Sequence, residues 1–490
     1  MLKKQSRESI IEIQNTFNKY KEVVDDVALL KFCGKVKEIT GSLIISEGPF
    51  AKLGDICRIY KSDKTYIDCE VIGFRNQDVL ISAYGSVNGI TFGNMVYSFD
   101  KPLSIMCSDK LLGNILDGMG KPLNGCVHKF YETPISIHHR AVNPLNRHRI
   151  KEHIQTGVRA IDGLLTVGKG QRMGIMSGTG VGKSTLLSMI ARNTNADVNV
   201  IALIGERRRE VLDFIERDLG EEGLKKSVII VATSDDAPLL RVRAAYTATT
   251  IAEYFRDKGK DVMFMMDSVT RFALAQREIG LSRGEPPTTR GYTPSVFSEL
   301  AQLLERTGTS KKGTITAFYN VLVEGDDLDE PITDAVRGII DGHIVLSREL
   351  ANRGHFPAID INKSISRIMS EVVSDMHKKS AKEFLKMSAD YNEVKELIMI
   401  GGYAKGSMPE VDKAIEYKPA MDKYLQQDIY EISSFADSKE SLLSMFYSRE
   451  EIENDLLESG DIKIENENSK ISDNVQYVGD NLLNDNLVIL

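Results

Sequence analysis

The chain has 490 residues, of which 42% are hydrophobic and 27% charged, and its formal net charge is −8. That length is too great for one ordinary hydrophobic core and predicts two or three domains of a soluble, globular protein. No apolar run approaches the roughly 20 residues that a membrane-spanning helix needs. The first residues also lack the apolar core of a secretory signal. The composition therefore argues against an integral membrane protein and predicts a cytoplasmic one.

The negative charge is concentrated near the carboxyl end. Residues 450–490 carry eleven acidic side chains and two lysines, a net charge of −9, which leaves the remaining chain near +1. A nearly neutral body argues against a basic nucleic-acid-binding protein. The five cysteines are odd in number and include no C-x-x-C, so we expect small buried hydrophobic side chains rather than a disulfide framework or a zinc site.

The first two segments differ in pattern. Residues 1–26 are predicted to be a docking segment, because their apolar residues are spaced as in a short amphipathic helix: Ile10, Ile11, Ile13, Phe17 and Tyr20. A frayed terminus packed loosely on its own domain is an equally good interpretation. Residues 27–97 change to short β-type runs punctuated by glycine, such as Ser42–Ile45 and Asp78–Ser82. This spacing predicts a small β-barrel.

Residues 98–379 are predicted to form an α/β domain together with the turn-rich connector that leads into it. Near-continuous apolar runs such as Val198–Ile204 and Val262–Met266 alternate with helical stretches. That alternation is typical of a mainly parallel sheet covered on both faces. Sheets of this kind bind ligands at the carboxyl ends of their strands.

The glycine-rich stretch Ser177–Thr185 follows one apolar run and precedes a helical stretch. Such a loop leaves backbone N–H groups free for phosphate oxygens, while its lysine reaches the outer phosphates and the next hydroxyl binds Mg²⁺. The predicted nucleotide-binding residues are Gly178, Thr179, Gly180, Val181, Gly182, Lys183, Ser184 and Thr185. Ser177 stands where the strict pattern has glycine, so the motif is a variant P-loop; a glycine-rich surface turn is the alternative.

Two carboxylates end strands of the predicted sheet. Asp267 follows Val262–Met266 and can hold the water shell of Mg²⁺ beside the hydroxyl of Ser184. Glu206 follows Val198–Ile204 and could orient and deprotonate the attacking water, while Arg207 could stabilise charge on the phosphoryl oxygens. A surface ion pair at a helix start is an equally good interpretation of these last two residues.

The last third of the chain is less informative. Arg367 and Phe356 lie in a stretch that carries glycine and proline, and from the residues alone a solvated arginine and a core aromatic are the simpler interpretations. Residues 380–434 are predicted to be a helical C-terminal domain. Residues 435–490 are acidic and rich in asparagine, so we expect a largely disordered tail with one short helix near Glu450–Leu457.

Several stretches resemble one family closely. Gly180–Thr185, Ala202–Arg207 and Met266–Phe272 are similar to those of the ATPase of bacterial flagellar protein export, and so are Ala275–Gly280, Gly284–Tyr292 and Val323–Asp327. The resemblance runs from about residue 30 to 433 and extends to type III secretion ATPases and, more distantly, to catalytic subunits of rotary ATP synthases. Leu239–Tyr246 look like the flagellar version of their helix.

The resemblance implies a RecA-type P-loop core between the barrel and the helical domain, assembled as a homohexameric ring with nucleotide between subunits. It implies one role for each matching residue: Lys183 and Ser184 act in the P-loop, Asp267 lies behind the Mg²⁺, Glu206 is the catalytic carboxylate, Arg207 contacts the γ-phosphate, Arg367 is the arginine finger supplied to the neighbouring site, and Phe356 packs against adenine.

The implied function is hydrolysis of ATP with Mg²⁺ to energise flagellar type III protein export, by unloading substrates and chaperones at the export gate. The implied partners are a stator-like regulator at residues 1–26, the export gate, chaperones and export substrates, and not nucleic acid. The implied location is peripheral at the flagellar base. Two departures from the family pattern are Arg208, where glycine is usual, and Glu299–Gln302, which replace Leu-Pro.

Three other functions stay open. The same enzyme could serve a virulence type III secretion system. A non-catalytic nucleotide-binding subunit is disfavoured because Glu206 and Arg367 occur in one chain. An RNA-driven helicase would want a basic, aromatic-lined RNA face in the N-terminal domain, and residues 27–97 show no such cluster.

Overall fold

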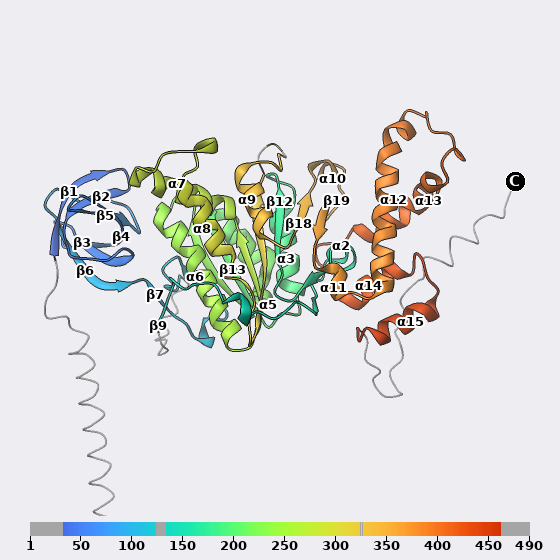
Figure 1. The fold of residues 1–490 in the computed structure, drawn as a ribbon, viewed down its shortest axis with the longest axis horizontal. Helices are drawn as coiled ribbons and strands as arrows, with labels where there is room; N and C mark the ends of the chain where they lie inside the picture. Colours follow the sequence, from blue (N-terminus) through green and yellow to red (C-terminus); the bar gives the residue numbers. More distant parts are fainter. Residues whose placement is uncertain (1–32, 124–133, 324, 326, 462–490) are drawn as a thin grey trace, which may run out of the picture. The chain divides into compact units, whose positions relative to one another are not determined.

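The computed structural model describes residues 33–123, 134–323, 325 and 327–461 (Figure 1). The predicted docking segment, residues 1–26, lies outside the described residues, as do residues 462–490 of the predicted tail. The chain divides into two compact units at Leu103/Ser104. Among the described residues, no helix is both long and apolar enough to cross a bilayer.

The first unit is a closed six-stranded barrel, as predicted. Its strands are paired in the order β1-β2-β5-β4-β3-β6, and β6 also pairs with β1. They are β1 (Cys33–Thr40), β2 (Leu43–Glu47), β3 (Asp55–Tyr60), β4 (Tyr66–Arg75), β5 (Asp78–Ala83) and β6 (Met95–Pro102). Alternate residues such as Cys57, Ile59 and Val71 fill the interior. Cys69 and Cys107 are buried, as expected. Cys33 is exposed, so the expectation that the cysteines are buried is wrong for this residue.

The second unit is built on a nine-stranded sheet with the order β19-β18-β12-β17-β15-β13-β14-β8, and β16 pairs with β17. The strands are β8 (Ile115–Asp117), β12 (Arg172–Ser177), β13 (Val198–Glu206), β14 (Ser227–Thr233), β15 (Asp261–Asp267), β16 (Gly308–Thr309), β17 (Thr314–Leu322), β18 (Gly342–Leu346) and β19 (Ile359–Ser366). The neighbouring strands are parallel except for β19 on β18 and β16 on β17. The predicted α/β class is confirmed.

Helices cover both faces of this sheet, since all nine residues of β13 are buried. Ile201 and Leu203 of β13 share one hydrophobic cluster with Leu187 and Ile190 of α3. The helices of this region are α2 (Arg159–Leu164), α3 (Lys183–Asn193), α4 (Arg208–Asp213), α5 (Gly220–Lys225), α6 (Pro238–Asp257), α7 (Val269–Arg283), α8 (Pro294–Leu304), α9 (Pro331–Ile339), α10 (Arg348–Asn352) and α11 (Met369–Val372). Short pairs join β7 (Ser104–Met106) to β9 (Pro134–Ser136), and β10 (His153–Ile154) to β11 (Val167–Gly168).

The C-terminal region is helical, as predicted, but it extends past the expected boundary at residue 434. Its helices are α12 (Asp375–Met399), α13 (Pro409–Leu425), α14 (Phe435–Leu443) and α15 (Arg449–Glu458) (Figure 1). Leu443, Ile452 and Leu456 form a small buried cluster. Lys439, 1% exposed, pairs with Asp455 and Asp461 at 2.7 Å. Residues 435–461 are therefore packed, because part of their acidic charge is neutralised inside the fold.

Candidate nucleotide-binding site

The predicted P-loop connects β12 to α3. Gly180 and Gly182 have φ angles of +79° and +93°, a backbone conformation that residues with a Cβ rarely adopt. Gly182 directly precedes α3 and has no side chain to cap the N–H groups of the first turn. Those N–H groups also have no partner within the helix. The loop and the start of α3 therefore form an anion-binding site of the kind that the sequence predicts.

Lys183 meets both predicted carboxylates. Its Nζ lies 2.8 Å from Oδ1 of Asp267 and 3.6 Å from Oε1 of Glu206. β13 and β15 are adjacent in the sheet, so the two carboxylates leave neighbouring strand ends. Glu206 is 8% exposed and Asp267 is 4% exposed. The structure thus brings together three of the residues that the sequence singles out, in a space largely withdrawn from water.

Burial controls the charge of this cluster. Desolvation, reinforced by repulsion from Asp267, raises the pKa of Glu206 to about 8, although the ammonium of Lys183 opposes the shift. Burial acts to lower the pKa of Lys183, but the attraction of Asp267 and Glu206 outweighs it and the pKa is raised. Burial and the charge of Asp267 therefore favour the neutral form of Glu206, whereas the contact with Lys183 favours its ionised form.

Two residues that the sequence did not single out complete the cluster. Asn320 in β17 donates from Nδ2 to Oδ1 of Asp267 at 2.6 Å. Arg271, in the first turn of α7, packs its aliphatic carbons against Gly205, and its buried Nε has no hydrogen-bond partner among the described residues. The sequence features that could have pointed to them are an amide in an apolar run, for Asn320, and a position inside the Met266–Phe272 motif, for Arg271.

Arg207 lies outside this cluster within the chain. Its side chain is 77% exposed and pairs with Glu210 at 3.3 Å. The next residue, Arg208, pairs with Asp235 at 2.6 Å and thereby joins the segment after β13 to the segment after β14. The unusual arginine is therefore accommodated by a surface ion pair beside the site.

Phe356 does reach the P-loop. A Cβ built on Gly182 would lie 3.7 Å from carbons of the Phe356 ring. The ring is 45% exposed, and the Phe356 carbonyl accepts a hydrogen bond from the backbone N–H of Gln427 at 3.0 Å. An exposed aromatic face beside a phosphate-binding loop is available for stacking on a base.

Arg367 lies at the opposite edge of the sheet from the P-loop. It follows β19, which runs antiparallel to β18, and its N–H donates to the carbonyl of Asp341 at 3.1 Å. Asp341 in turn donates to the carbonyl of Arg172, the first residue of β12. Five residues separate Arg172 from Ser177, which is roughly 16 Å along a strand. The structure therefore does not bring Arg367 to its own Lys183.

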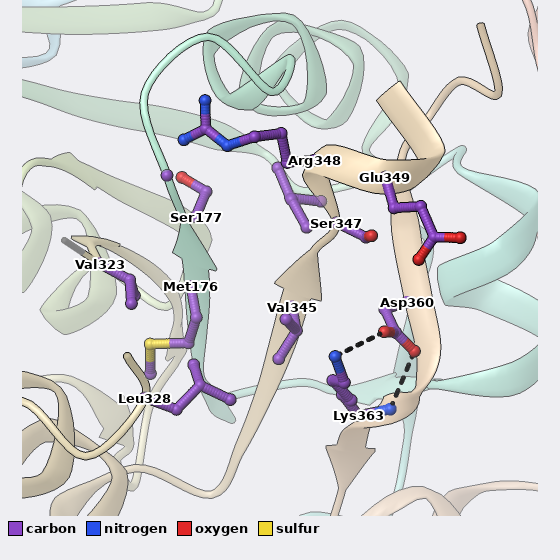
Figure 2. A pocket seen from close by; sticks show the side chains of 12 residues that line it. Met176, Ser177, Val323, Leu328, Val345, Ser347, Arg348, Glu349, Asp360 and Lys363 are labelled. Atoms are coloured by element: carbon purple, nitrogen blue, oxygen red, sulfur yellow. Dashed lines mark hydrogen bonds and ion pairs between the residues drawn. The ribbon is translucent and has the colours of Figure 1, made fainter. Parts of the chain in front are cut away.

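A cavity of about 230 Å³ adjoins the base of the P-loop (Figure 2). Apolar residues form part of its lining: Met176, Val323, Leu328 and Val345. The polar lining includes Ser177, Arg348, Glu349, Asp360 and Lys363. Ser177, the departure from the strict motif, is 1% exposed, and its Oγ has no hydrogen-bond partner among the described residues. Lys183, Glu206 and Asp267 do not line this cavity, so it is separate from the carboxylate cluster.

The residues present fit Mg²⁺. Ser184 follows Lys183 in the first turn of α3, and Lys183 contacts the carboxylate of Asp267. Hydroxyl and carboxylate oxygens, which are ligands that Mg²⁺ prefers, are therefore both available. Oε1 of Glu206 and Oδ1 of Asn320 are buried acceptors without a hydrogen bond among the described residues. Water molecules bound to a cation are donors that suit such acceptors.

Comparisons with known proteins match both the nucleotide-binding region and the C-terminal helices to known families. Residues 157–366 match the model of the ATP synthase alpha/beta family, nucleotide-binding domain, and residues 373–444 match that of the T3SS EscN ATPase C-terminal domain. The assembled ATPase EscN from the type III secretion system of enteropathogenic E. coli is similar in structure, with a TM-score of 0.80, 46% identity and coverage of 84% of this chain and 98% of that one.

Curated relatives cover most of the chain. The flagellum-specific ATP synthase of Bacillus subtilis is 50% identical over 446 residues, which is 91% of this chain and 99% of the relative. The type 3 secretion system ATPase of Xanthomonas euvesicatoria is 46% identical over 413 residues, or 84% and 93% of the two chains. The chain therefore belongs to the family of flagellum-specific ATP synthases and type III secretion ATPases.

Proposed function

We propose that this protein hydrolyses ATP with Mg²⁺ and energises protein export through the flagellar type III apparatus. The observation that carries the proposal is the contact of Lys183 with Asp267 and Glu206 at the start of the P-loop helix. The flagellum-specific ATP synthase of Bacillus subtilis, which is 50% identical to this chain, supports the flagellar branch.

The first part of the mechanism is binding. Backbone N–H groups of the P-loop hold the phosphates, and Lys183 exchanges its carboxylate partners for phosphate oxygens. Ser184 and Asp267 would hold the Mg²⁺, which supplies neutralisation of phosphate charge. The ring of Phe356 packs against the adenine.

The second part is proton transfer. Glu206 orients the attacking water and accepts its proton, for which a raised pKa is favourable because the ideal base titrates near the working pH. Arg207 moves from its exposed pair with Glu210 to the γ-phosphate. These residues complete half of a site.

The other half comes from a second copy. Arg367 is the arginine finger for the neighbouring subunit, a role worth roughly 10³–10⁵ in rate in other phosphoryl-transfer enzymes. We propose a homohexameric ring in which every subunit interface holds one nucleotide. The placement of Arg367 at the edge of the sheet away from its own P-loop supports this arrangement.

The cellular context follows from the family. The protein acts in the cytoplasm, peripherally at the flagellar base, where it unloads chaperones and export substrates at the export gate. Residues 1–26 bind a stator-like regulator. EscN has been solved in complex with its central stalk EscO, which supports a stalk-like partner for this ring as well.

A virulence secretion system is the second candidate, supported by the Xanthomonas euvesicatoria relative. Restored motility in a flagellar ATPase deletion strain would separate the two functions.

The test of the activity is the ATPase rate of the purified full chain as a function of protein concentration. We expect specific activity to rise steeply with concentration as rings form. Lys183→Ala should lower turnover by at least about 10³-fold and Glu206→Gln by at least about 10²-fold. Glu216→Gln, which alters an exposed acid, should leave turnover unchanged. Substantial turnover by Glu206→Gln would refute the role of that carboxylate, and a flat specific activity would refute a site completed by a second subunit.

A further inference from the structure

Asn320 is a buried amide in contact with the carboxylate cluster. It lies in β17, the strand between β12 and β15, and it is 0% exposed. Its Nδ2 donates to Oδ1 of Asp267 at 2.6 Å, and the same oxygen accepts from Nζ of Lys183 at 2.8 Å. One carboxylate oxygen therefore has two donors, a mobile ammonium and an amide fixed in the middle of a sheet.

The orientation of the amide follows from this contact. With the opposite assignment, Oδ1 of Asn320 would face a carboxylate oxygen, and two acceptors repel each other at hydrogen-bond distance. Nδ2 therefore faces Asp267, and Oδ1 is the atom left without a hydrogen bond among the described residues. An unpaired buried carbonyl carries a desolvation penalty that a hydrogen bond would remove.

Asn199 in β13 shows what a structural asparagine looks like in the same sheet. It is also 0% exposed, and its Oδ1 also lacks a hydrogen bond among the described residues. Its Nδ2, however, donates to the carbonyl of Ala191 at 2.8 Å, in the last turn of α3. That bond satisfies one of the carbonyls that every helix leaves open at its end. Within the part of the chain that the structure describes, the amide of Asn320 has no such backbone partner and donates to the carboxylate of Asp267 instead.

We propose that Asn320 is a positioning residue for Asp267 and for the water shell of Mg²⁺. The proposal rests on the proposed function, in which Lys183 leaves Asp267 for phosphate oxygens. Asp267 then keeps one protein donor at Oδ1, the amide of Asn320, which holds the carboxylate in place. Oδ1 of Asn320, which has no hydrogen-bond donor among the described residues, would be available to a water bound to Mg²⁺. Residues behind metal-binding groups commonly act in this way.

The test measures metal-dependent nucleotide binding by the full chain, without turnover. A fluorescent, non-hydrolysable ATP analogue is bound first in EDTA and then with increasing Mg²⁺, for the unaltered protein, Asn320→Leu and the matched control Asn199→Leu. We expect Asn320→Leu to bind the analogue in EDTA as the unaltered protein does. It should need about 10–100-fold more Mg²⁺ to reach half of the increase in analogue binding that Mg²⁺ produces. Asn199→Leu should follow the unaltered protein.

Three outcomes would overturn the proposal. The first is a Mg²⁺ titration of Asn320→Leu that coincides with that of the unaltered protein. The second is a titration of Asn199→Leu that is displaced as far as that of Asn320→Leu. Failure of the unaltered protein to bind the analogue at all would reject the proposed function, and this inference with it. If circular dichroism shows that Asn320→Leu does not fold, Asn320→Ala and Asn199→Ala, which add no volume, replace the pair with the same expected shift.

Discussion

Mixing two inactive variants tests which subunit supplies Arg367. Lys183→Ala removes the P-loop ammonium, and Arg367→Ala removes the guanidinium at the other edge of the sheet. Within one chain the backbone of Arg367 is level with Arg172, roughly 16 Å along the strand from Ser177. An ion pair needs about 4 Å or less. Each chain therefore carries the two groups in different sites, and each variant damages only one half of any site.

The proposed arrangement predicts how much ATPase activity the mixture of the two variants should recover. Each variant alone should be at least about 10³-fold less active than the unaltered protein, by comparison with other arginine fingers and phosphate-binding lysines. In rings assembled from equal amounts, about one quarter of the interfaces pair an intact P-loop with an intact Arg367, because each partner is drawn independently. The mixture should therefore recover up to about a quarter of the unaltered rate, on the order of a hundredfold above either variant.

The assay is steady-state phosphate release at fixed total protein and varied ratio of the two variants, with ring formation followed by light scattering. The matched control mixes Lys183→Ala with Glu206→Gln, whose defects lie in the same half of the site and should not complement. A mixture of Lys183→Ala and Arg367→Ala that forms rings but stays as inactive as its components would refute the assignment of Arg367 to the neighbouring site. Recovery in the control would refute the division into halves.

Two further predictions concern the C-terminal helices. Lys439→Met removes the buried ammonium that pairs with Asp455 and Asp461, whose side chains are 13% and 5% exposed, and should lower the free energy of unfolding in urea by about 3–5 kcal/mol. Lys413→Met, which removes an exposed pair at 2.8 Å, should cost at most about 1 kcal/mol. Equal losses would show that burial is not decisive. Burial lowers the pKa of His377 to about 4, below that of an unfolded histidine, so stability should be lost as the pH falls from about 6.5 towards 4, by up to about 1.4 kcal/mol per pH unit. His377→Gln should flatten this dependence in thermal unfolding, and an unchanged profile would contradict it.

The positions of Glu206 and Asp267 could be predicted because they follow from topology. Each ends an apolar run, and the carboxyl ends of parallel strands meet at one edge of a sheet. The adjacency of β13 and β15, which brings both carboxylates to Lys183, came only from the structure. Alternation of apolar runs with helices is compatible with several strand orders, so the sequence indicated a common edge but not which strands are neighbours.

Asn320 and Lys439 were missed for a different reason. Asn320 lies in β17, and the carboxylate that it contacts lies 53 residues earlier in the chain. No local spacing encodes such a pair. Lys439 and its acidic partners belong to a stretch whose composition predicts disorder, since unpaired charges cannot be buried. Composition gives the number of charges but not which of them form ion pairs. In this fold the ion pairs of Lys439 offset the desolvation cost of burying its charge.

The direction of β19 explains why Arg367 lies away from the P-loop of its own chain. The connection from Leu346 to Ile359 contains the short α10, and β19 then runs antiparallel to β18. Whatever follows an antiparallel strand emerges at the edge of the sheet opposite the P-loop. Arg367 must therefore act outside its own chain if it acts on nucleotide at all. A closed ring satisfies this condition at every interface, and any partner that loosens the ring would then also switch off hydrolysis.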